Sequence, residues 1–80
     1  MVSMTITTDV VEIARARDLA RSGTGRTIRV SAQLSLEEVG QAVGIAASTV
    51  LRYERGERMP RGGPGVAWAR LMMQLVNRGQ

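Results

Sequence analysis

The chain has 80 residues, enough for one small domain built around a single core. It contains no cysteine and no histidine, which excludes a disulfide framework and an ordinary zinc site. All of its basic residues are arginines, and their excess over the acidic residues gives a formal net charge of +4.

Residues 1–8 are polar and β-branched and have no partner strand, so we expect a flexible N-terminal arm. The segment 1–12 lacks the basic start and apolar stretch of a signal peptide. No apolar run approaches the roughly 20 residues that a membrane span needs. We therefore expect a soluble protein in the cytoplasm, with residues 9–80 forming a single helical domain.

A first helix is predicted from Asp9, whose carboxylate would cap the first turn with Glu12 as its reciprocal partner. Ser22 and Gly23 are expected to end this helix. Apolar residues recur along it at helical spacing, namely Val10, Ile13, Ala14, Ala16, Leu19 and Ala20.

A second helix is predicted from Thr24 to Gln33, although Gly25 and its β-branched residues lower the helix propensity there. Ile28 and Ala32 would face inward, and Leu34 would close the joint to the next helix.

Residues 35–56 predict two short helices joined by a tight turn. Ser35 and Glu38 have the spacing of a capping box at the start of the first helix. Gly40 permits a close approach, and Gly44 stands where a helix end needs a left-handed backbone. The apolar positions that would face one another are Val39, Val43, Ile45, Val50 and Tyr53.

Residues 25–76 resemble the Cro and lambda-repressor-like helix-turn-helix family, also called the XRE family. The resemblance rests on L-S-L-E-E-V-G-Q-A-V-G, S-T-V-L-R-Y-E-R-G-E-R-M-P and A-W-A-R-L-M. It implies an all-α, lambda-repressor-like bundle of about five helices, to which this chain adds an extra N-terminal helix. Ala46 departs from the pattern, because a capping serine or threonine is usual there.

In a helix-turn-helix, the outward face of the second helix meets base edges in the major groove. Helical spacing turns Ala47, Ser48, Leu51 and Arg52 outward, and the family's base-contacting positions correspond to Ala47, Ser48 and Arg52. A guanidinium at Arg52 would pair with guanine O6 and N7. The alternatives are a solvated Arg52 and a Ser48 that only helps to cap the helix.

Contacts to DNA phosphates are expected from two places. One is the start of the first helix of the pair, where backbone amides point outward. The other is the end of the second helix of the pair, the predicted recognition helix over residues 47–55, and the loop after it, since residues 52–80 carry the whole positive excess. The loop arginines have a plain alternative as a solvated surface. The candidate residues are Ser35, Leu36, Thr49, Arg55, Arg58 and Arg61.

The resemblance also implies a structural ion pair between Arg29 and Glu54, which occupy the family's paired positions. A C-terminal helix over residues 65–78, ended by Gly79, is apolar nearly all round. Val66, Met73 and Val76 are therefore predicted to form a dimer interface. The alternative is that the extra N-terminal helix covers them.

The leading functional hypothesis is a sequence-specific DNA-binding transcriptional regulator. It would be a small phage or bacterial repressor whose homodimer reads a near-palindromic operator on double-stranded DNA. One alternative is an antitoxin-type protein that binds a toxin and autoregulates its operon. Another is an architectural factor in phage recombination. We expect no enzymatic activity, cofactor, small-molecule substrate or membrane association.

Overall fold

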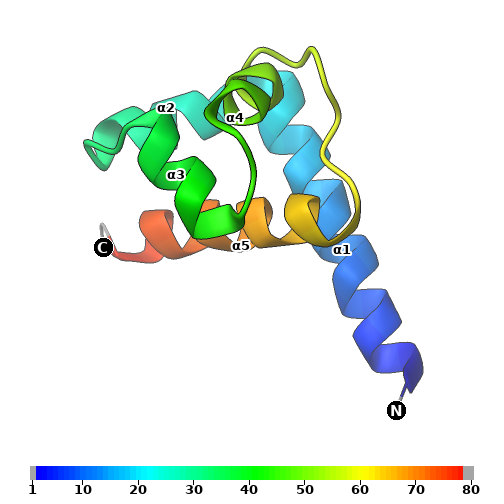
Figure 1. Ribbon diagram of the computed structural model, residues 1–80. Helices are drawn as coiled ribbons and strands as arrows, with labels where there is room; N and C mark the ends of the chain where they lie inside the picture. The colour runs from blue at the N-terminus through cyan, green and yellow to red at the C-terminus, as the bar shows by residue number, and fades with distance from the viewer. Residues whose placement is uncertain (1, 79–80) are drawn as a thin grey trace.

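The computed structural model describes the backbone of residues 2–78 and the side-chain environments of residues 10–78. This part of the chain is helical without strands, as predicted. Its helices are α1 (Val2–Ser22), α2 (Thr24–Ser31), α3 (Leu36–Val43), α4 (Ala47–Glu54) and α5 (Gly62–Arg78). Figure 1 shows α5 running across the base of the bundle, with α3 and α4 above it and α1 at one side. No helix within residues 2–78 is long and apolar enough to cross a membrane.

Trp68 of α5 is the centre of the core and is completely buried. Its ring lies 5.1 Å from the ring of Tyr53 of α4, at an angle of 57° between the planes. Tilted aromatic pairs of this kind add stabilisation beyond the area they bury. The other buried apolar side chains of the core come from α1, α3, α4 and α5. The half-buried Ile28 of α2 packs against this core. The buried apolar residues are Ala16, Ala20, Val39, Val50, Tyr53, Val66, Trp68, Ala69 and Met72.

The start of α1 differs from the prediction. The helix begins at Val2, so Asp9 lies inside it and does not cap its first turn. Residues 2–8 are therefore helical, and the flexibility expected of this arm stays a prediction. Intrinsic propensity is a weak constraint on β-branched residues. Once the second half of α1 is fixed against α5, each further turn needs only propagation, which is far easier than nucleation.

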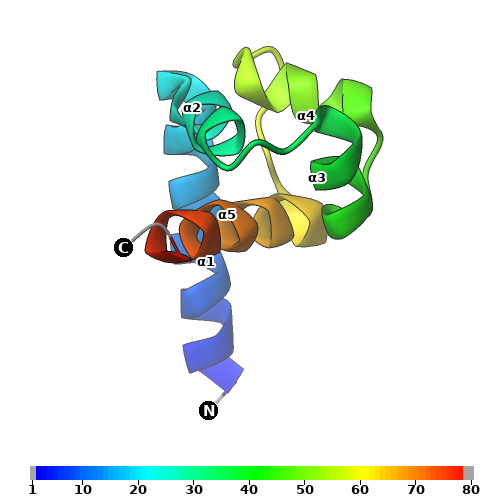
Figure 2. The same ribbon diagram turned by 90° about the vertical axis from the view of Figure 1, so that its left-hand side faces the viewer.

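The inward face of α1 is also shorter than predicted. Ala16 and Ala20 are buried, whereas Val10 is 60% exposed and Ala14 is exposed. The N-terminal part of α1 extends beyond the other helices (Figures 1 and 2), so apolar residues in that part have no helix to pack against. Ala14 instead lies on a different side of α1 from Ala16 and Ala20, because consecutive residues are about 100° apart on a helix.

The end of α2 comes two residues earlier than predicted, at Ser31. Gln33 adopts a left-handed backbone with φ 61°, and its N–H donates to the carbonyl of Val30 at 2.9 Å. The N–H of Leu34 donates to the carbonyl of Arg29 at 3.2 Å. Together these are the two bonds of a Schellman motif, with glutamine in the position that usually holds glycine.

The C-terminal helix starts at Gly62, three residues before the predicted start at residue 65. Pro64 therefore lies in the first turn of α5. Proline is tolerated there because the missing N–H would have no partner within the helix. The predicted terminator Gly79 lies outside the described residues.

Candidate nucleic-acid interface

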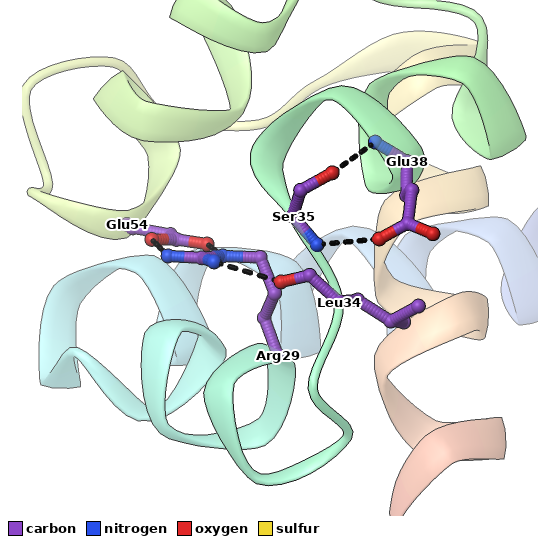
Figure 3. A network of polar contacts seen from close by, with 5 residues as sticks. All are labelled: Arg29, Leu34, Ser35, Glu38 and Glu54. Atoms are coloured by element: carbon purple, nitrogen blue, oxygen red, sulfur yellow. Dashed lines mark hydrogen bonds and ion pairs between the residues drawn. The ribbon is translucent and has the colours of Figure 1, made fainter.

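The start of α3 is fixed by the predicted capping box. The backbone N–H of Glu38 donates to Ser35 Oγ at 3.0 Å, and the N–H of Ser35 donates to Glu38 Oε1 at 2.8 Å (Figure 3). Two amides that the helix cannot satisfy internally therefore have partners. The hydroxyl of Ser35 is committed to this cap.

The turn between α3 and α4 depends on two glycines. Gly44 has φ 88°, and its N–H donates to the carbonyl of Gly40 at 2.7 Å. The N–H of Ile45 donates to the same carbonyl at 2.9 Å. A Cβ on Gly40 would lie 2.6 Å from the carbonyl oxygen of Ile45, which no real side chain tolerates. Both glycines predicted to shape this turn therefore have a structural requirement to be glycine.

The orientation of α4 is set by its buried face. Val50 is completely buried and Tyr53 is 4% exposed, so both face the core as predicted. Residues on the opposite side of the same helix must then face solvent. Ser48 and Arg52 are exposed, whereas Ala47, Thr49 and Leu51 are half-buried. The structure thus presents Arg52 at the surface of a helix that follows a tight turn.

A family model described as a helix-turn-helix domain matches residues 26–73. The chain belongs to this helix-turn-helix family. It is therefore a DNA-binding protein, with α3 and α4 as its two-helix unit. The match runs from α2 into α5 and leaves α1 outside it. No curated protein and no solved structure matches the chain.

The N-terminus of the recognition helix α4 has no side-chain cap. Ala46 precedes it with φ −69° and ψ 150°, the extended conformation of an N-cap residue, but its methyl group accepts no hydrogen bond. The first amides of α4 therefore rely on partners outside the N-cap side chain. These amides lie at the positive end of the helix dipole, beside the half-buried Ala47 and the exposed Ser48.

The arginines predicted to contact phosphate all lie at the surface. Arg55, Arg58 and Arg61 are exposed, and Arg58 and Arg61 line one surface hollow. Arg17 and Arg21 of α1 line the same hollow and are not among the residues that the sequence predicts to contact phosphate. Their spacing of four residues was the available signal, because it places both on one side of a helix. The sequence does not show that this side of α1 faces the loop after α4, because that depends on how α1 packs against the rest of the domain.

Arg29 of α2 and Glu54 at the end of α4 form the ion pair that the resemblance implied (Figure 3). Arg29 Nε donates to Glu54 Oε2 at 2.5 Å, and Nη2 donates to Oε1 at 3.0 Å. Nη1 donates to the carbonyl of Leu34 at 2.9 Å, so one guanidinium connects α2, the link before α3, and α4. The hydrogen bond to Glu54 raises the pKa of Arg29, although burial opposes this change.

The α5 residues predicted to form a dimer interface are not equivalent. Val66 is only 8% exposed, so its assignment to an interface is wrong. The physical reason is the neighbouring helix: α1 packs against α5, and Ile13 and Val66 line the same hollow between the two helices. Met73 and Val76 remain half-buried. Met73 borders a hollow of about 570 Å³ with Arg15 and Leu19 of α1.

Replacement of Arg29 by alanine should destabilise the fold, because it leaves the Glu54 carboxylate, 1% exposed, without its charged partner. The loss should be roughly 3–5 kcal/mol in the free energy of unfolding, measured with urea. The matched control is Arg26→Ala on the same helix, where the side chain is exposed. An Arg29→Ala protein that keeps its full stability would contradict this role.

Replacement of Gly40 by alanine should lower stability by roughly 1–3 kcal/mol, since the new methyl group meets the Ile45 carbonyl and the turn must shift. Gly63→Ala is the matched control, because a Cβ there meets nothing within 4 Å. That control should be neutral or stabilising by up to about 1 kcal/mol. Thermal unfolding followed by circular dichroism compares the two. Equal effects would refute the close approach at Gly40.

Proposed function

We propose that this helix-turn-helix protein is a sequence-specific transcriptional repressor of the Cro and lambda-repressor-like kind, acting in the cytoplasm of a bacterial host. The observation that carries the proposal is the exposed Arg52 on the outward face of α4. When α4 lies in the major groove, the Arg52 guanidinium donates to O6 and N7 of a guanine. Bound protein blocks access to the DNA, a role that needs neither a catalytic group nor a cofactor.

The other outward residues of α4 have few hydrogen-bond donors. Ala47 and Leu51 offer methyl groups to a thymine methyl, and Ser48 offers one hydroxyl to a base or phosphate. Arg52 would therefore make the main hydrogen bonds to base edges. The remaining specificity would come from DNA shape and deformability at neighbouring base pairs.

Phosphate contacts hold α4 in register on the duplex. We assign them to two sets of residues on either side of the recognition helix. The amide at Leu36 and the hydroxyl of Thr49 form one set, next to Ser35, whose own amide and hydroxyl are held in the capping box. The exposed arginines Arg55, Arg58 and Arg61 form the other. Their positive charge makes the affinity fall steeply with salt through counterion release.

A homodimer on a near-palindromic operator is the proposed assembly, because a two-fold axis presents two α4 helices about one helical turn apart. Met73 and Val76 of α5 are half-buried and so keep some exposed surface for a second copy. The alternative function, an antitoxin that also represses its own operon, is favoured by different residues. Val10 and Val11 on the projecting part of α1 are 60% and 46% exposed, and a partner protein would cover them.

Selection of bound sequences from a random duplex pool identifies the operator and its symmetry. On the selected duplex, Arg52→Ala should weaken binding by roughly 1–3 kcal/mol, about 5- to 150-fold, and relax the preference at one base pair. Fluorescence anisotropy at fixed salt measures the affinity.

Arg52→Lys is the matched control for charge, because it keeps the cation but loses the two-pronged donor. It should lose the same base preference while retaining the salt dependence. Equal affinity of the unmodified protein for selected and scrambled duplexes would contradict the proposed function.

A further inference from the structure

Four arginines surround a single hollow of about 480 Å³ beside the helix-turn-helix. Arg17 and Arg21 come from α1, and Arg58 and Arg61 come from the loop between α4 and α5. Met59 is the remaining residue of the lining, which therefore contains no carboxylate. Four positive charges from two segments far apart in the sequence therefore lie around one hollow.

Such a grouping is unfavourable by itself, because like charges repel and a pair at i and i+4 on one helix face is destabilising. The ion pair that Arg21 makes on α1 is weak. Asp18 Oδ1 lies 3.8 Å from Arg21 Nη1, and the two side chains are 79% and 69% exposed. An exposed pair at that distance contributes little. Arg21 is therefore still able to bind an external anion.

The hollow is held at a fixed place relative to the recognition helix. The carbonyl of Arg52 accepts the N–H of Glu57 at 2.9 Å and the N–H of Arg58 at 3.3 Å, so the loop begins directly against the end of α4. Pro60, between Arg58 and Arg61, is among the fully buried side chains and anchors the loop.

The same loop also packs closely against α1. The backbone at Gly56 approaches α1 so closely that a Cβ there would lie 3.4 Å from the carbonyl oxygen of Ala20. Ala20 is buried and Arg21 follows it on the surface. Figure 1 shows this arrangement, with the loop after α4 passing beside the C-terminal part of α1.

We propose that Arg17 and Arg21 of α1, together with Arg58 and Arg61, form a binding surface for the sugar-phosphate backbone of DNA. This inference rests on the proposed function, because the ligand must be an extended polyanion that also follows α4. The four guanidiniums would contact phosphates flanking the base pairs that Arg52 reads. α1, which lies outside the family match, would thus extend the DNA-binding surface rather than only cover α5.

The test compares the double variant Arg17→Gln/Arg21→Gln with the unmodified full chain. Affinity for a labelled 30-base-pair duplex is measured between about 50 and 200 mM salt, on the selected sequence and on a scrambled one. Loss of two phosphate contacts should lower the slope of log affinity against log salt by about 2. The difference should appear on both duplexes, because phosphate contacts do not depend on sequence.

The matched control is Arg15→Gln/Arg78→Gln, which removes the same charge from exposed residues that do not line the hollow. Its slope should stay close to that of the unmodified chain. An unchanged slope in Arg17→Gln/Arg21→Gln, or an equal loss in the control, would overturn the assignment. Equal affinity for the two duplexes would instead contradict sequence-specific regulation and leave the slope comparison valid. A full chain without measurable affinity for either duplex would overturn both.

Discussion

The rotation of α4 about its own axis decides which side chains this protein can offer to DNA. Val50 and Tyr53, three residues apart, are both buried against a core centred on Trp68. Helical geometry then leaves Arg52 no direction except outward. The bidentate contact between Arg29 and Glu54 fixes the far end of the same helix. Because α4 is already fixed in the free protein, DNA binding does not have to order it. The loss of conformational entropy on binding is therefore smaller.

The additional helix α1 does two things in this arrangement. Its second half packs Ala16 and Ala20 into the core, and α1 crosses α5 and packs against it, where Val66 is buried. The arginines on its outer side meet the loop that follows α4. Core packing and charge therefore come from adjacent sides of one helix, because each arginine directly follows a buried alanine. A small domain with little room for a larger core gains both stability and a broader basic surface.

Features with a local cause were predictable from the sequence. The capping box at Ser35, the left-handed turn at Gly44 and the inward pair Val50 and Tyr53 each follow from residues within one helix length. Pro64 was a local signal as well, but the glycines around it indicated a loop, and the start of α5 was placed too late.

Features that depend on tertiary packing were not predictable in the same way. Val66 looked available for a partner only because the path of α1 was unknown. Arg17 and Arg21 looked like ordinary solvent-exposed residues of an amphipathic helix for the same reason. The exposure of Val10 depends on how far α1 extends beyond its neighbours. None of these facts follows from the spacing of apolar residues. That spacing shows which side of a helix is apolar, but not which other element packs against it.

The most direct test of the account is a titration of isotope-labelled protein with duplex DNA, followed by the chemical shifts of the backbone amides. We expect the largest changes in residues 47–52 of α4 and in the adjoining loop 55–61. Large changes confined to α2 and α5, with residues 47–52 unperturbed, would contradict the claim that the outward face of α4 lies against DNA.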